Sequence, residues 1–262
     1  MTISLAQIQG IISTTETIGA IVPAEITKAV KRAANVREAV YAMTSDRNEL
    51  STAVLAAIDA KRDPAADPEV QRITTMQALS DGVQTQVSNL ADADALSALQ
   101  GNVDTLIESW QEPFDKAAQE IATAAKRLGN IKLEEAAAIL HQGGDAAEHW
   151  GIATRANRTI REILDAFALL AHTTGFAALT RHYIVQRMAE VTLEQWEEHQ
   201  LKEQKLSAWE AHHLGLTLSL ATRETLPLRI HQLSKTRDSR AATAKDRENN
   251  KGSGDWMDKY KK

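Results

Sequence analysis

The sequence contains no cysteine and has few aromatic, proline and glycine residues. Among its 262 residues, aromatic residues make up 4%, and there are 5 Pro and 12 Gly. The absence of cysteine excludes disulfide bonds, thiolate catalysis, iron–sulfur clusters and cysteine-ligated zinc. The scarcity of Gly and Pro argues against collagen-like, proline-rich and turn-dense β architectures.

Long hydrophobic runs are also absent. The longest stretch without a formal charge, residues 166–180, is interrupted by His172 and Gly175. It is shorter than the roughly 20 apolar residues that a membrane-spanning helix needs. The first residues, 1–7, show neither the basic nor the apolar segment of a secretory signal. We therefore expect a cytoplasmic protein, or a component of a virion or other assembly, and no membrane-spanning helix.

Residues that favour helices dominate what is present. The apolar fraction of 43% and the charged fraction of 25% are typical of a folded globular chain. Long stretches rich in Ala, Glu, Gln, Lys and Leu lose little side-chain freedom on entering a helix. The composition predicts an all-α fold, an elongated bundle of about 8–10 helices with an extended polar, basic C-terminal tail.

Capping and helix-breaking residues place the boundaries of these helices. Asp67 and Pro68 suit an N-cap and a first helical position, and Gly129 suits a C-terminal one. Thr192 and Gln195 have the spacing of a capping box. A turn is expected at 91–94, and Leu214–Leu220 is assigned to a helix because no partner strand is visible. The expected helices span 23–43, 44–62, 68–90, 95–111, 113–129, 145–171, 176–189 and 193–213.

Composition divides the chain into three regions. Residues 1–130 are rich in Ala, residues 131–238 contain Trp and His, and residues 239–262 form the polar tail. The first region has only small and aliphatic anchors, so its helices bury little area per residue. Such helices usually need long mutual contacts or a partner subunit.

Motifs of known catalytic sites are missing. The chain has no phosphate-binding loop, no nucleophile elbow, no dinucleotide fingerprint and no metalloprotease helix. Glu210 and His213 have the Glu-x-x-His spacing of di-iron bundles, but such sites use two of these pairs and two further Glu residues. We expect no cofactor and no catalytic residue. A helical enzyme or metal carrier using His149, His199, Glu210 and His213 is the alternative.

The C-terminal tail is the candidate partner-binding segment. Between Lys235 and Lys262 there are nine basic and five acidic residues, which gives this segment a net charge of +4 and the rest −9. A segment so poor in apolar residues should be flexible on its own. Aromatic anchors and basic residues in it are expected to bind another subunit, and the basic ones could contact nucleic acid without sequence preference. The predicted contact residues are Trp256, Met257, Tyr260, Arg237, Arg240, Lys245, Arg247 and Lys251.

These patterns favour a non-enzymatic assembly protein that binds copies of itself or neighbouring subunits. Ala-rich helices, mixed charge, no cysteine and an anchoring tail are together similar to assembly and connector components of tailed-phage virions and of other bacterial assemblies. This similarity is one of general pattern, and no motif carries it. A helical pore former that inserts residues 166–180 is a further alternative.

Overall fold

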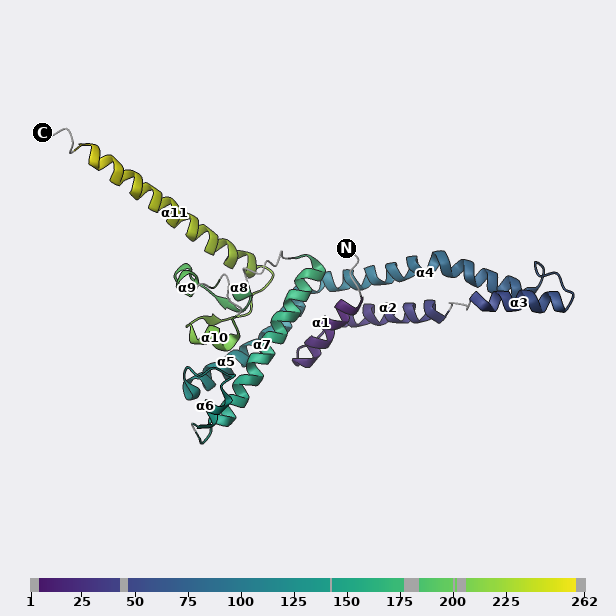
Figure 1. The fold of residues 1–262 in the computed structure, drawn as a ribbon, viewed down its shortest axis with the longest axis horizontal. Coiled ribbons are helices and arrows are strands. Elements are labelled where there is room, and N and C mark those ends of the chain that lie inside the picture. Colours follow the sequence, from purple (N-terminus) through teal and green to yellow (C-terminus); the bar gives the residue numbers. More distant parts are fainter. Residues whose placement is uncertain are drawn as a thin grey trace. The chain divides into compact units, whose positions relative to one another are not determined.

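The computed structural model describes residues 5–42, 47–141, 143–176, 184–199, 201 and 206–257. Within them the chain forms eleven helices and two strands of two residues each (Figure 1). The predicted all-α multi-helix fold is confirmed. The chain divides into two compact units, the first made of residues up to Ser13 with Val22–Val103 and the second of Thr14–Ile21 with residues from Asp104 onward.

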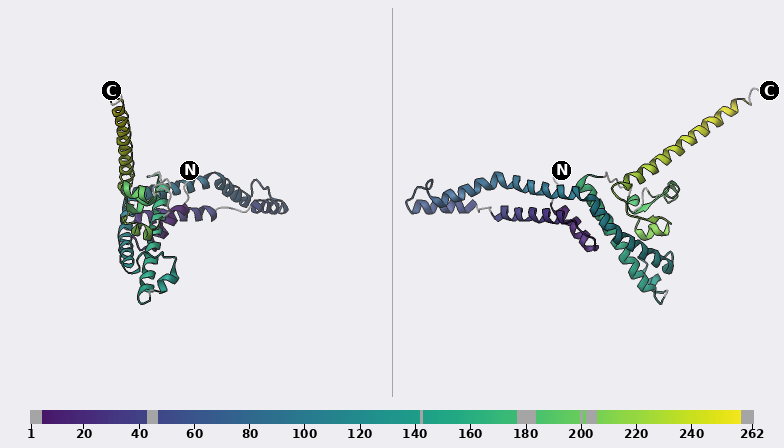
Figure 2. Two further views of the ribbon diagram at one scale, coloured as in Figure 1. Left: turned by 60° about the vertical axis from the view of Figure 1, so that its left-hand side comes forward. Right: turned by 180° about the vertical axis from the view of Figure 1, so that it is seen from behind.

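The first unit is built around a long helical hairpin. It begins with the first part of α1 (Leu5–Thr17) and continues with α2 (Ala24–Ala42), α3 (Arg47–Asp59) and α4 (Pro68–Gly101). Helix α4 packs against both α2 and α3, and Figure 2 shows α2 running alongside it. We call α2, α3 and α4 together the helical hairpin.

Ion pairs fix the antiparallel register of the helical hairpin. Arg32 pairs with Asp94 at 3.1 Å, and Arg37 pairs with Asp92. Further along, the Gln84 side chain donates to the Val40 carbonyl at 3.3 Å. Residue numbers therefore rise along α2 as they fall along α4. The buried apolar side chains of α2 and of this part of α4 are small or medium-sized: Ile26, Val30, Ala33, Ala91, Ala95 and Leu99.

The turn expected at 91–94 is wrong, because α4 runs unbroken through these residues to Gly101. Ala91 is buried, and the two Asp carboxylates face arginines of α2. Asp favours turns mainly when its carboxylate bonds to nearby backbone, and here that carboxylate has a tertiary partner instead. The helix ends at Asn102, whose N–H donates to the Leu99 carbonyl.

The second unit packs two long helices with several short elements. Its main helices are α5 (Val103–Leu128) and α7 (Ala146–Thr174), and its largest fully buried side chains include Trp110, Phe114 and Phe167. The remaining elements are α6 (Ala136–His141), α8 (Ile184–Met188), β1 (Ala189–Glu190), α9 (Leu193–Glu198), α10 (Ala208–His213), β2 (Thr217–Leu218) and α11 (Thr225–Met257).

The sequence predicts that Pro113 starts a new helix. In the structure it lies inside α5 instead. A proline within a helix costs about 3 kcal/mol. Trp110 and Phe114 flank it and are both fully buried. Burying one large apolar side chain contributes about 1.5–3 kcal/mol, so the two together outweigh the break. At the other end, α5 stops before Gly129 as predicted, and Gly129 has a φ of 65°.

The helical assignment of Leu214–Leu220 is also wrong. Thr217–Leu218 form β2, which pairs antiparallel with β1 in the register Ala189 to Leu218. Two further backbone bonds, from Ser219 to Met188 and from Ala221 to Arg187, extend this pairing. The partner strand lies nearly thirty residues earlier, and its two residues show no alternation that the sequence could reveal.

Between residues 193 and 213 the structure describes two short helices instead of one long helix. The predicted capping box of Thr192 and Gln195 is confirmed at the start of α9. A second capping box, formed by Ser207 and Glu210, begins α10. Each box satisfies two N-terminal N–H groups, which allows a helix of six residues to begin at each site.

Helix α7 begins after Asp145 as predicted, but it continues three residues beyond the expected end at Ala171, to Thr174. Gly175 adopts a φ of 72°, and its N–H donates to the Ala171 carbonyl. The Asp145 side chain makes no cap hydrogen bond. It pairs with Arg127 at the end of α5 instead, at 2.6 Å. This ion pair joins the end of α5 to the start of α7.

Helix α11 packs through its first turns and then continues to Met257. Leu226 and Leu233 are buried, and Arg229 donates to the carbonyls of Gln186 and Ser219 at 3.0 Å. Composition predicts a flexible tail from Ser239, but the backbone is helical there. The division expected at 238/239 therefore falls within α11, and the one at 130/131 falls in the loop after α5 of the second unit.

Two of the expected helices fall only partly within the described residues. The first residues of the helix expected at 44–62 lie outside them, as does half of the helix expected at 176–189. None of the helices in the described ranges combines the length and apolar character that crossing a bilayer requires.

The cap of α4 provides a first test of the fold. Asp67 is 3% exposed and accepts hydrogen bonds from the N–H groups of Glu69 and Val70. We expect Asp67→Ala to lower the free energy of unfolding by about 1 kcal/mol, because these two helical N–H groups lose their partner. Urea unfolding followed by circular dichroism measures this loss.

Asp67→Asn is the matched control. It keeps the capping oxygen but weakens the ion pair with Arg62, which spans 2.6 Å. We expect Asp67→Asn to lose clearly less stability than Asp67→Ala. Equal losses would assign the effect to the ion pair and contradict the capping role.

Candidate interaction sites

The helical hairpin carries large apolar side chains that remain exposed. Tyr41 of α2 is 83% exposed, and Leu90 of α4 is 68% exposed. Leu55 and Ile58, three residues apart on α3, are 61% and 53% exposed. Single exposed apolar residues are ordinary on protein surfaces. Here they recur on all three helices of the hairpin.

On α4 the exposed apolar residues follow a helical spacing. Val87 and Leu90 are separated by three residues, and both are exposed. Along the sequence, positions 83, 79 and 76 continue the same three- and four-residue spacing with Val, Leu and Met. This spacing is typical of a seam along which one helix packs on another.

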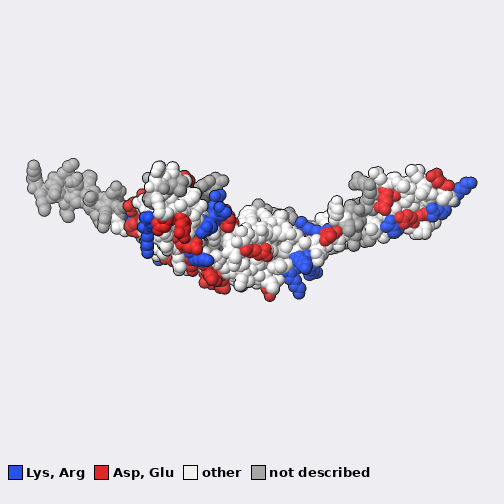
Figure 3. Space-filling model, turned by 90° about the horizontal axis from the view of Figure 1, so that it is seen from below, with Lys and Arg blue, Asp and Glu red and all other residues white. Residues whose placement is uncertain are grey.

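Charged side chains surround the exposed apolar ones at the α3 end of the helical hairpin. Figure 3 shows Lys and Arg interleaved with Asp and Glu there. Arg72 pairs with Glu69 at 2.7 Å and with Glu49 at 3.5 Å. Arg72 and Glu69 are both exposed, and hydrogen bonding to Arg72 lowers the pKa of the Glu69 carboxyl group. These charges satisfy one another, so this end has no strong net attraction for ligands of either sign.

In the second unit, three aromatic side chains hold the loop between α5 and α6. The Trp209 indole N–H donates to the Ile131 carbonyl at 3.0 Å, and the Trp150 indole donates to the Leu133 carbonyl at 2.9 Å. His213 reaches the Gly129 carbonyl at 2.8 Å. We call these three side chains the loop clamp. It attaches α10 and α7 to the backbone that leaves α5.

His213 takes part in the loop clamp through both ring nitrogens. Its Nδ1 lies 2.9 Å from the Trp209 carbonyl, and its Nε2 contacts Gly129. Both contacts are with backbone carbonyl oxygens. With its two ring nitrogens facing these carbonyls, the His213 side chain is not turned toward a metal site.

The alternative metal site is not assembled in the structure. His149 lies 3.4 Å from Asp145, Glu210 caps its own helix, and His199 ends α9. Across the ranges that the structure describes, no group of three His, Asp or Glu side chains is close enough to hold a metal ion. The Glu210–His213 spacing reflects a cap and a clamp on one short helix.

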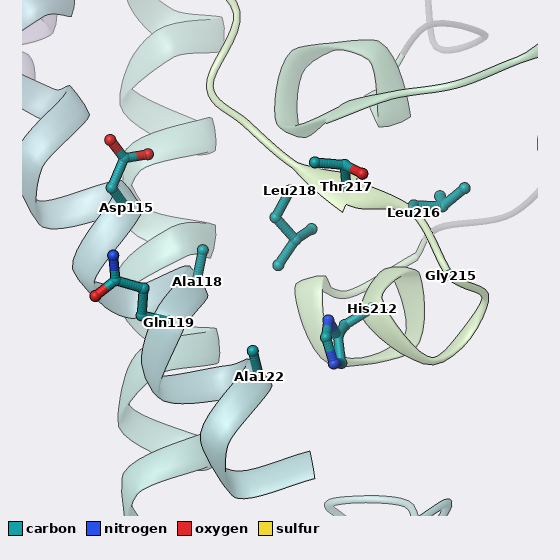
Figure 4. A pocket seen from close by; sticks show the side chains of 9 residues that line it. All are labelled: Asp115, Ala118, Gln119, Ala122, His212, Gly215, Leu216, Thr217 and Leu218. Carbon is teal, nitrogen blue, oxygen red and sulfur yellow. The ribbon is translucent and has the colours of Figure 1, made fainter. Parts of the chain in front are cut away.

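A groove of about 530 Å³ lies between α5 and the segment that joins α10 to β2. Figure 4 shows Asp115, Gln119 and two alanines of α5 on one wall, and His212 with residues 215–218 on the other. The small alanines leave room beside α5. Burial lowers the pKa of His212, and the positive charges of His213 and Lys126 lower it further. The groove thus offers a neutral imidazole, an amide and a carboxylate.

These groove residues are suited to binding and lack a catalytic arrangement. Within the described part of the chain, no hydrogen bond or ion pair joins Asp115 to His212, and no serine lines the groove. A general base needs a partner within hydrogen-bonding reach to activate a nucleophile. The groove supplies hydrogen-bonding groups beside apolar side chains, which is what a bound chain or small molecule requires.

Only two of the tail residues predicted to bind a partner have described side chains. Arg237 is exposed and lies 3.6 Å from the carboxylate of its neighbour Asp238. Arg240 pairs with Glu194 and, at 3.2 Å, with Glu197 of α9. The backbones of Lys245, Arg247, Lys251, Trp256 and Met257 belong to α11, but their side chains lie outside the description, as does Tyr260 entirely. Their partner-binding role stays a prediction.

Comparisons with models of protein families, with curated proteins and with solved structures found no match.

The lowered pKa of His212 has a consequence for stability. An imidazole whose pKa is lower in the folded chain binds more protons when unfolded. Stability is therefore lost as the pH falls through the ordinary histidine value of 6.5 towards the folded value. We expect His212→Gln to remove part of the decline in melting temperature between about pH 7.5 and 5.5.

His172→Gln is the control, because His172 is exposed on α7. It should leave the pH dependence of the melting temperature as in the unmodified protein. An unchanged pH dependence in His212→Gln as well would contradict the lowered pKa of the His212 imidazole, and with it the effects of burial and of the nearby charges of His213 and Lys126.

Proposed function

We propose that the protein is a non-enzymatic assembly subunit that binds further copies of itself or neighbouring subunits through its helices. The observation that carries this proposal is the exposure of Tyr41, Leu55, Ile58 and Leu90 on the helical hairpin. A helix is stable in water mainly when its apolar side packs against another element. In the helical hairpin, these apolar side chains remain exposed to solvent in the single chain.

The length of α4 gives the proposed contact enough surface. The helix has 34 residues, which corresponds to about 50 Å at 1.5 Å per residue. Stable interfaces bury roughly 800 Å² on each partner. A second helix lying along α4 and contacting Val87 and Leu90 therefore has enough length for an interface of that size.

The balanced charges of the helical hairpin support a protein partner over nucleic acid. Arg32, Arg37, Arg62 and Arg72 each pair with a carboxylate within the hairpin. Binding to nucleic acid relies on basic side chains that neutralise phosphates. Contact with nucleic acid is left to the basic end of α11, where Trp256 and Tyr260 are the proposed anchors on a neighbouring subunit. A role in a bacterial or tailed-phage virion assembly fits this proposal.

Leu90→Glu tests the proposed contact. A buried, unpaired charge at the seam should weaken self-association at least about tenfold, because one such charge costs more than about 1.4 kcal/mol. The folded chain should tolerate the change, since Leu90 is 68% exposed. Sedimentation velocity at several protein concentrations measures association, and circular dichroism checks helical content.

Asn89→Glu provides the matched control. Asn89 precedes Leu90 and is exposed, and it lies two residues from Val87, so the change adds the same charge off the three- and four-residue spacing of the seam. It should leave association as in the unmodified chain. Equal effects of the two substitutions, or an unmodified protein that is monomeric at every concentration, would overturn the proposal.

A further inference from the structure

The second unit contains a cavity of about 470 Å³ on the side of α10 that faces α7. Its apolar lining includes Ile160, Leu164 and Leu206, and its polar lining includes Asn157 and Arg187. This volume falls within the range of roughly 300–1,000 Å³ that is usual for small-molecule sites. Apolar walls with a few polar groups among them are also the usual make-up of such sites.

Arg187 is a partly buried charge on the wall of this cavity. Burial is the main influence on its guanidinium and lowers its pKa, although the charge of Asp165 partly opposes this effect. Its Nη1 donates to the Leu164 carbonyl at 3.3 Å. Among the described residues, no carboxylate oxygen lies within 4 Å of it. A guanidinium has five N–H donors, and this bond uses one of them on a side chain that lines the cavity.

Asn157 adds a second donor to the cavity wall. Its Oδ1 accepts a hydrogen bond from the Trp209 backbone N–H at 3.2 Å, which fixes the orientation of the amide. The amide nitrogen is therefore left as a donor on the cavity lining. Two donor groups, one of them charged, match the two oxygens of a carboxylate.

The acidic residues of the lining are solvated and do not cancel this preference. The Asp165 side chain is 77% exposed, and its contact with Arg161 is long, at 3.9 Å. Glu134 is also exposed. Charges in water are screened, whereas a partly desolvated charge interacts strongly with whatever enters beside it. Arg187 therefore sets the sign of ligand that the cavity accepts.

We propose that this cavity binds a small organic monocarboxylate, with its carboxylate on Arg187 and Asn157 and its apolar chain against Ile160, Leu164 and Leu206. This site goes beyond the assembly function proposed above. It lies in the second unit, whereas the apolar seam belongs to the first. Loss of one therefore does not imply loss of the other.

Hexanoate is the probe, and calorimetric titration of the full chain is the measurement. Hexylamine and hexanol have the same chain without the carboxylate. We expect saturable binding of hexanoate, and binding of the other two that is weaker by about tenfold or more, since one charge-assisted hydrogen bond is worth about that much. Equal binding of all three would show an unspecific apolar cavity and overturn the proposal, as would absence of hexanoate binding.

Two nearly isosteric substitutions should change the affinity in opposite directions. Asp165→Asn removes an opposing charge and should tighten hexanoate binding a few-fold. Asn157→Asp keeps an oxygen for the Trp209 N–H but places a negative charge on the cavity wall, so it should weaken binding. Changes in the reverse direction, or no change in either variant, would contradict the assignment.

Arg187→Gln should abolish measurable hexanoate binding. Arg155→Gln, an exposed arginine of α7 that does not line the cavity, serves as its control and should bind as the unmodified protein does. Circular dichroism establishes that each variant is folded. Unchanged hexanoate binding in folded Arg187→Gln would also overturn the proposal.

Discussion

Two antiparallel helices can bury only the side that each turns toward the other, and this limit governs the first unit. In the helical hairpin, the space between α2 and α4 is filled largely by small residues such as Ala33, Ala91 and Ala95. Arg32–Asp94 and Arg37–Asp92 set the register beside them. Apolar residues outside this narrow core, including Tyr41 and Leu90, have nothing in the hairpin to cover them. The proposed assembly would cover these exposed residues with a further helix.

The second unit achieves a fuller core, and its short helix α10 has an unusual place in it. The loop clamp of Trp150, Trp209 and His213 ties the backbone after α5 to α7 and α10. One side of α10 then lines the groove beside α5, and the other lines the cavity beside α7. Six residues with one capping box would be a marginal helix in isolation. The loop clamp holds α10 in place, so that its residues line both the groove and the cavity.

Local chemistry could be predicted from the sequence, and tertiary choices could not. The caps at Asp67 and Thr192 and the helix end at Gly129 depend on residues within a few positions, so the sequence predicts them correctly. The missing turn at 91–94, the strand at 217–218 and the helix through Pro113 each depend on contacts with distant residues. The same holds for the candidate sites. The importance of Arg187 depends on its position beside Leu164 and Asn157, and the exposure of Leu90 depends on which part of α4 the other helices leave uncovered.

Hydroxyl-radical footprinting with mass spectrometry tests most directly whether the hairpin surface is covered in the native particle. Leu228 on α11 is 64% exposed, close to the 68% of Leu90, and serves as an internal reference. Covered side chains react slowly because solvent radicals cannot reach them. If the helical hairpin binds a further helix, we expect Tyr41 and Leu90 to be protected from oxidation relative to Leu228 at high protein concentration, and to lose this protection on dilution. Reactivity of Tyr41 and Leu90 that matches their exposure in the single chain at every concentration would contradict it.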